Sequence, residues 1–226
     1  MRCKQMDKTR DLFDLSHTLA APLLEKAECP WEALGLLRDF ILSLGPALPR
    51  EEYSEIAPGI WAARDARISP TAYLGAPCII GRKTEVRHCA FIWGSALIGD
   101  NAVVGNSTEI KNAILLDGVQ APHFNYVGDS ILGHLSHMGA GAVTSNVKSD
   151  KTPVTVKNGE EQIPTGLKKL GAMVGDFADV GCNSVLNPGT VLGRRVSVYP
   201  LSSVRGTVPA GHIYKSRNDI VPRKEQ

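Results

Sequence analysis

An aliphatic residue stands at every sixth position through the middle of this chain, and this spacing constrains the fold more than any other feature. A first unbroken series runs from Ile68 to Leu116, and a second runs from Val174 to Val204. A period of six fits neither the 3.6-residue period of an α-helix nor the plain alternation of an isolated strand. It therefore predicts a chain that turns a corner after every short strand. The two series consist of Ile68, Leu74, Ile80, Val86, Ile92, Ile98, Val104, Ile110 and Leu116, and of Val174, Val180, Leu186, Leu192, Val198 and Val204.

Small residues and glycines accompany the aliphatic positions. A small or β-branched residue, such as Ala72 or Cys78, stands four residues after most of them, and glycine often follows them directly, as at Gly75 and Gly81. Three six-residue repeats make one triangular coil, with the aliphatic residue inside and the small residue at a corner. We expect the glycines to relieve strain where the backbone bends with positive φ. The predicted fold class is an all-β solenoid, a parallel β-helix.

Composition places the chain among ordinary globular proteins. Of its 226 residues, 43% are hydrophobic and 21% are charged, which is enough for one core and an appendage. A net charge of +2 does not favour a nucleic acid or a membrane as partner. No apolar run reaches the ~20 residues of a bilayer span, and no secretory signal is expected, so the predicted location is cytoplasmic. The five cysteines form no CxxC pair of the kind that binds zinc.

The N-terminal region has helical character instead of the six-residue period. We expect a domain of residues 1–50 followed by the β-helix over 51–226. Within the first domain, apolar residues line one face of the segment after Pro30, and Gly45 ends that helix. A shorter helix is expected around 11–27. This region is predicted to cap one open end of the prism, and an oligomerisation arm is the alternative interpretation.

A loop is predicted to project from the β-helix at about 144–173, where the repeat stops. It contains the segments Val154-Thr155-Val156 and Gln162-Ile163 on either side of the turn pair Asn158-Gly159. This order is typical of a β-hairpin. Such loops often carry binding residues, although the charged residues here are equally consistent with a solvated loop.

The most specific motifs lie in the stretches 105–113, 121–129 and 138–146. Over 94–217, and most densely over 105–146, the chain resembles the C-terminal acetyltransferase domain of the bacterial bifunctional N-acetylglucosamine-1-phosphate uridyltransferase/glucosamine-1-phosphate acetyltransferase. Similar signatures occur in stand-alone proteins related to UDP-N-acetylglucosamine pyrophosphorylase. The resemblance implies a left-handed β-helix that assembles as a homotrimer. It also implies an N-acetyltransferase that uses acetyl-CoA and an amino sugar or amino-sugar phosphate.

The resemblance assigns chemistry to individual residues. His123 matches the general base that takes a proton from the sugar amine, and imidazole suits this step because its ordinary pKa of about 6.5 leaves it largely neutral near pH 7. Lys111 and Tyr126 match residues that bind the sugar phosphate, and His137 stands where the family has an asparagine that contacts the sugar.

A second set of residues matches the family's acetyl-CoA contacts. Ala140, Asn146 and Cys182 match residues along the cofactor, with Cys182 in place of a serine. Arg217 matches an arginine that meets a phosphate of the cofactor. Pro200 replaces an alanine near the cofactor.

One departure concerns specificity. Trp93 stands where the family has its main phosphate-binding arginine, and an indole offers one donor and no charge. A phosphate would then need another cation, such as Arg82 or Arg87. No glycine-rich loop followed by a βαβ unit precedes the repeats, so uridyltransferase chemistry is not expected.

Two other classes of function are alternatives to the transferase. His134 and His137 are spaced for a metal site, but the chain lacks the His-x4-His pair of β-helical carbonic anhydrases, and no metal is predicted. The alternative to catalysis is a noncatalytic β-helix that binds a sugar nucleotide or CoA in a regulatory or assembly role.

Overall fold

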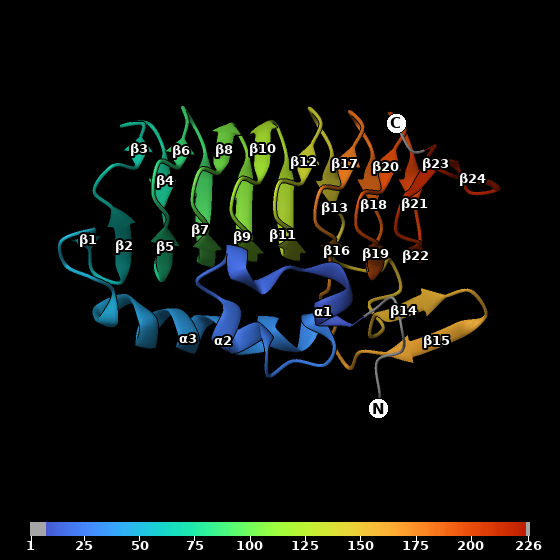
Figure 1. The fold of residues 1–226 in the computed structure, drawn as a ribbon, viewed down its shortest axis with the longest axis horizontal. Coiled ribbons are helices and arrows are strands. Elements are labelled where there is room, and N and C mark those ends of the chain that lie inside the picture. Colours follow the sequence, from blue (N-terminus) through green and yellow to red (C-terminus); the bar gives the residue numbers. More distant parts are fainter. Residues whose placement is uncertain (1–7, 225–226) are drawn as a thin grey trace.

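The structure, a computed structural model, describes residues 8–224 and contains a triangular prism of stacked coils (Figure 1). The strands of face A are β2 (Ile60–Ala63), β5 (Cys78–Ile80), the second halves of β7 (Phe91–Ile98), β9 (Glu109–Leu115) and β11 (Tyr126–Leu132), then β16 (Ala172–Val174), β19 (Thr190–Leu192) and β22 (Thr207–Val208). Face B consists of β3 (Arg67–Ile68), β6 (Glu85–Val86), β8 (Val103–Asn106), β10 (Gln120–His123), β12 (His137–Met138), β17 (Asp179–Val180), β20 (Ser197–Val198) and β23 (His212–Ser216).

Face C completes the triangle with β4 (Tyr73–Leu74), the first halves of β7, β9 and β11, then β13 (Val143–Thr144), β18 (Val185–Leu186) and β21 (Ser203–Val204). All neighbours within the three faces pair in parallel, whereas β1 (Tyr53–Ala57) and β24 (Asp219–Pro222) add antiparallel pairs at the two ends. The predicted fold class, an all-β left-handed parallel β-helix with short N-terminal helices, is confirmed.

The interior of the prism is the predicted stack of aliphatic residues, with one correction. Leu115, and not Leu116, occupies the interior position, and Leu116 belongs to a separate cluster outside face A. Ile98 pairs with Leu115, so this coil is one residue shorter than the coil that joins Ile80 to Ile98. Because successive side chains of a strand point to opposite faces, a one-residue deletion moves the next aliphatic residue outward.

The repeat glycines serve a different purpose from the one expected. Gly75 and Gly81 do not have positive φ; a Cβ at either position would collide with the backbone of the next coil. The positive φ values lie instead at corner residues such as Asn101 (54°) and Ser107 (52°). These glycines therefore permit the close approach of neighbouring coils. The left-handed corners hold short polar residues, which tolerate this region, but also larger ones such as Phe124 and Leu201.

The N-terminal helices lie along face A, not over an end of the prism (Figure 1). They are α1 (Thr9–Leu12), α2 (Ala21–Leu24) and α3 (Leu37–Leu44), with 3-10 turns at Leu15–His17, Pro30–Gly35 and Gly45–Ala47. Their apolar side chains share one buried cluster with the outward residues of face A, including Ile79, Leu97 and Ile114. The expected end cap is thus wrong, because a whole face is apolar and must be covered. The division at residue 50 and the role as an oligomerisation arm stay predictions.

The predicted hairpin is present within the loop. Strands β14 (Thr155–Asn158) and β15 (Glu161–Pro164) pair in antiparallel register around Gly159, which has a φ of 60°. One side of the hairpin is not solvated, because Val154, Val156 and Ile163 join the cluster over face A. The hairpin therefore extends the helical layer toward the C-terminal coils, as Figure 1 shows. Among residues 8–224, no helix is both long and apolar enough to cross a bilayer.

Asp176 ties the N-terminal segment to the prism. Its side chain, 1% exposed, accepts hydrogen bonds from the backbone N–H of Asp14 (2.7 Å) and of His134 (2.8 Å). The Nε of Arg194 lies 3.5 Å from one of its carboxylate oxygens. Burial raises the pKa of Asp176, opposed by these hydrogen bonds and by Arg194. A desolvated carboxylate thus joins segments far apart in the sequence.

We expect Asp176→Ala to lower the free energy of unfolding by about 2 to 4 kcal/mol, because two buried N–H groups lose their acceptor. Asp176→Asn should cost less, since the amide oxygen keeps one acceptor and no buried charge remains. Urea titrations of the three proteins measure the difference. Equal midpoints for wild type and Asp176→Ala would show that this carboxylate does not hold the segment.

Candidate active site

His123 lies at the edge of the prism where face B turns into face C, here called the B–C edge. Backbone hydrogen bonds align the successive coils at this edge: Gly141 N–H donates to the carbonyl of His123 (3.0 Å), and Asn183 N–H donates to that of Ala140 (2.8 Å). One residue from each coil therefore forms a column. In order, the column contains His88, Asn106, His123, Ala140, Cys182 and Pro200.

The imidazole of His123 is exposed at the end of β10 and has no hydrogen-bond partner among the described residues. The backbone below it is fixed. The backbone N–H of His123 donates to Oδ1 of Asn125 (3.1 Å). The buried side-chain amide of Asn125 donates in turn to the carbonyls of Gly139 (2.8 Å) and Ala142 (3.1 Å). The ring is thus free to meet a substrate on a rigid support, and Asn125 is a positioning residue that the motif analysis did not single out.

Two of the predicted cofactor residues follow His123 along the B–C edge. Ala140 and Cys182 occupy the next two coils, each about 4.8 Å further on. Arg217 stands just after β23, whose Tyr214 pairs with Val198. The exposed Arg217 lies in the turn between β23 and β24, beyond the last coil. His123, Ala140 and Cys182 thus lie in line on successive coils, as an elongated ligand would need, and Arg217 follows beyond the last coil.

Asn146 is not on this edge. Its amide donates to the hydroxyl of Tyr126 (3.2 Å) and to Oδ2 of Asp129 (2.6 Å). The structure therefore groups Asn146 with a predicted substrate residue instead of with the other cofactor residues. Burial raises the pKa of Tyr126, so its hydroxyl remains a proton donor at neutral pH.

Trp93 and Lys111 are in contact on face C. The Lys111 ammonium lies 4.9 Å from the centroid of the Trp93 ring, and the indole N–H donates to Oε1 of Glu109 (2.7 Å). Glu109 pairs in register with Tyr126, so this carboxylate stands among the predicted substrate residues. Sequence motifs alone did not indicate it. The indole thus contacts the one lysine expected to bind phosphate and is itself bonded to a carboxylate.

Neither arginine considered as a substitute joins this cluster. Arg82 pairs with Asp100 (2.8 Å) and Glu52 (3.3 Å), and Arg87 pairs with Glu85 (3.0 Å) on face B. Of these three side chains, only Lys111 is therefore available as a cation for the predicted phosphate site on face C.

The predicted sugar residue His137 lies on face B, with Nδ1 2.8 Å from Oδ1 of Asp179. Lys111 and Tyr126 lie on face C, so the two sets flank the edge that carries His123. His134 has different surroundings: it stacks on His17 at 3.7 Å, and its Nδ1 is 2.8 Å from the carbonyl of Asp117. No group of three or more His, Cys, Asp or Glu side chains arranged for a metal occurs within residues 8–224.

Comparison with known proteins confirms the resemblance. The chain is 33% identical over 109 residues to a bifunctional sugar-1-phosphate nucleotidylyltransferase/acetyltransferase of Sulfurisphaera tokodaii, covering 48% of this chain and 27% of that protein. It is 34% identical over 138 residues to the bifunctional protein GlmU of Methanococcus aeolicus, covering 61% and 33%. An uncharacterized acetyltransferase, YaiX, of Escherichia coli O6:K15:H31 is 28% identical over 161 residues, covering 63% and 70%. No protein-family profile matches the chain.

The bifunctional relatives match through their C-terminal acetyltransferase domain, and the chain spans about a third of their length or less. Among solved structures, the acetyltransferase NeuO, specific for polysialic acid, aligns with a TM-score of 0.42 at 12% identity, covering 70% of this chain and 82% of that one. The acetyltransferase domain of PglB from Neisseria gonorrhoeae aligns at 0.34 and 17% identity, covering 71% and 56%. By sequence, the chain is a homologue of acetyltransferase domains.

Proposed function

We propose that this protein transfers an acetyl group from acetyl-CoA to the amine of an amino sugar or an amino-sugar phosphate. The observation that carries the proposal is the B–C edge. An exposed imidazole is followed there by two small residues on the next two coils, and these three positions support a site for an elongated thioester ligand. The homology to acetyltransferase domains supports the same reaction.

The residues of this edge fit the steps of acetyl transfer. Acetyl-CoA would supply the activated thioester. His123 accepts the proton of the amine while the amine nitrogen forms the new C–N bond, the C–S bond breaks, and the thiolate leaves. Ala140 and Cys182 leave space along the edge because their side chains are small. Arg217 pairs with a phosphate through charge-assisted hydrogen bonds.

A panel assay tests this proposal. Release of free CoA is measured with amino sugars and their phosphates as acceptors, and release that depends on one acceptor class supports it. The noncatalytic alternative rests on the contact between Trp93 and Lys111, which occupies the predicted phosphate site. Binding of CoA without release for any acceptor would favour that alternative.

We expect Arg217→Ala to weaken CoA binding by about 1.5 kcal/mol, the lower end for hydrogen bonds to charged groups, since the guanidinium is exposed. Arg205→Ala is the matched control, because Arg205 is also exposed but follows β21 on face C. Calorimetry with CoA measures both variants. Equal affinities for wild type and Arg217→Ala would remove this residue from the site.

We also propose a homotrimer with closed threefold symmetry, because flat faces of neighbouring prisms can pack against one another. Face C carries an aromatic row of Tyr73, Phe91 and Trp93 with successive ring centroids 5.0 Å apart, and Tyr73 and Trp93 are 57% and 50% exposed in the single chain. Light scattering should give about three times the chain mass of 24.3 kDa. A monomer mass at micromolar concentration would contradict the trimer.

A further inference from the structure

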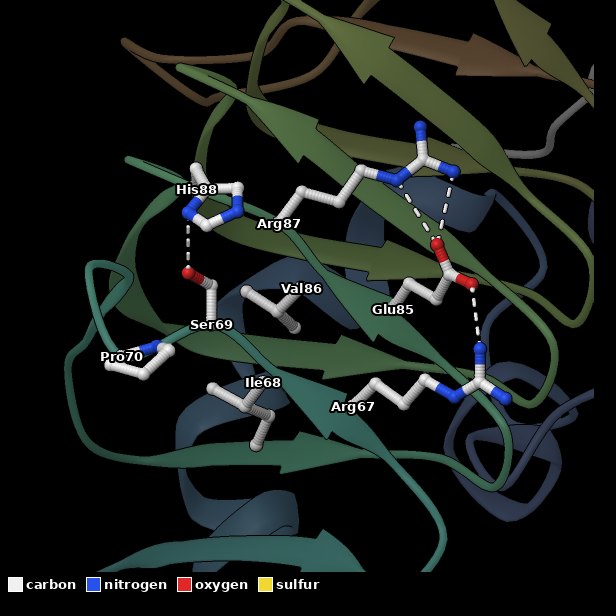
Figure 2. Close-up of a pocket in the computed structure, with 8 residues that line it drawn as sticks. All are labelled: Arg67, Ile68, Ser69, Pro70, Glu85, Val86, Arg87 and His88. Carbon is white, nitrogen blue, oxygen red and sulfur yellow. Dashed lines mark hydrogen bonds and ion pairs between the residues drawn. The ribbon is translucent and has the colours of Figure 1, made fainter.

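A pocket of about 440 Å³ lies on face B at the N-terminal coils (Figure 2). The pocket is formed by strands β3 and β6 and the residues that follow them, and none of the predicted site residues lines it. Figure 2 shows two arginines on either side of Glu85 and a histidine at the opposite end of the pocket. It is therefore a concave surface rich in hydrogen-bond donors.

The pocket has an excess of positive charge. Nε and Nη2 of Arg87 each lie 3.0 Å from one oxygen of Glu85, and Nη1 of Arg67 lies 3.6 Å from the other. Two guanidinium groups thus face one carboxylate. A guanidinium has five N–H donors, so these contacts leave donors for a further anion.

His88 connects this pocket to the proposed active site. Its Nδ1 lies 3.0 Å from the hydroxyl of Ser69, which leaves Nε2 for a ligand. His88 is also in the column of the B–C edge, two coils before His123, with Asn106 between them donating to its carbonyl (3.1 Å). Two coils correspond to about 10 Å along the edge.

Face C is poorly arranged for an acceptor phosphate, because the Trp93 ring already contacts Lys111 and the indole N–H is bonded to the Glu109 carboxylate, which would repel a phosphate. We propose that Arg67, Arg87 and His88 bind a diphosphate group, and that this group belongs to a nucleotide-linked amine whose amino nitrogen reaches His123. The diphosphate matches two guanidinium groups, which bind phosphate oxygens in a bidentate manner. The spacing of two coils leaves room for a sugar between diphosphate and amine. Only the link to the acceptor rests on the proposed function.

Binding of inorganic pyrophosphate and of UDP, measured by calorimetry without acetyl-CoA, tests the pocket. Arg87→Gln should weaken both by about five- to tenfold, since it removes a charge-assisted contact at a partly exposed site. Glu85→Gln should strengthen both, because the competing carboxylate loses its charge. Arg82→Gln is the matched control: Arg82 is also paired with carboxylates, but outside this pocket, and its loss should leave both affinities unchanged.

Four results would overturn the proposal: no binding of either ligand to wild type, wild-type affinity in Arg87→Gln, weaker binding in Glu85→Gln, or inorganic phosphate binding as tightly as pyrophosphate. Arg217→Ala should retain pyrophosphate affinity, which separates this pocket from the proposed cofactor phosphate contact. His123→Ala should bind pyrophosphate normally whether or not acetyl transfer occurs. Failure of the pocket is therefore distinguishable from failure of the proposed transferase activity.

Discussion

His123→Ala should lower the rate of acetyl transfer by about 10² to 10⁴, the usual contribution of a positioned general base. The prism should remain folded. The imidazole is exposed, and the hydrogen bonds of residue 123 are made by its backbone N–H and carbonyl, which alanine retains. Affinity for CoA should also remain, because Ala140, Cys182 and Arg217 are unchanged. The measurements are turnover with the best acceptor of the panel, CoA affinity by calorimetry and thermal unfolding.

The pH profile distinguishes a base from a merely structural histidine. Wild-type turnover should fall as acidification protonates the imidazole, because a protonated ring cannot accept the proton of the amine. That inflection should vanish in His123→Ala. His212→Ala is the matched control, since its imidazole bonds to the carbonyl of Ala210 at the C-terminal coils. Wild-type turnover in His123→Ala would favour the noncatalytic alternative.

The six-residue period was sufficient to predict the fold class but not the position of the helices. The six-residue period identifies only the side chains that point into the prism and carries no information about the outward side chains. The covering of face A could have been predicted from the residue that precedes each inward-pointing aliphatic residue, because that residue is aliphatic too. Ile79 precedes Ile80, and Leu97 precedes Ile98. Consecutive aliphatic residues mean that a strand is apolar on both sides. Face A therefore requires a second layer, and that pattern was readable in the sequence.

The site could be predicted only in part for a different physical reason. A local motif fixes the positions of residues within its own coil. Because successive coils differ little in length, His123 and Ala140 of neighbouring coils also lie on one edge. The position of Arg217 depends on the register at the last coil. The contacts of Trp93 with Lys111 and Glu109 join side chains from neighbouring strands, and in the face B pocket Arg67 pairs with Glu85 one coil away. No local motif records such pairs.

Ile110→Ala should lower the free energy of unfolding by about 2 to 5 kcal/mol, the cost of deleting a buried aliphatic side chain and leaving a cavity. Ile110 is fully buried and pairs with Ile92 and Val127, so it contacts the coils on both sides. Because the neighbouring coils stack directly above and below it, we expect the site to relax only partly. Ile110→Val should cost about 0.5 to 1.5 kcal/mol, in proportion to the smaller deletion.

Leu201→Ala is the control for this last prediction, because Leu201 is 79% exposed and its truncation should change stability by no more than about 0.5 kcal/mol. Urea titrations should be followed both by circular dichroism and by tryptophan fluorescence. Trp31 and Trp61 are buried in the cluster over face A, so fluorescence reports on the helical layer as well as on the coils. If helices and prism unfold as one unit, Ile110→Ala shifts both transitions together. A shift in circular dichroism alone would mean that the layer over face A unfolds independently of the aliphatic interior.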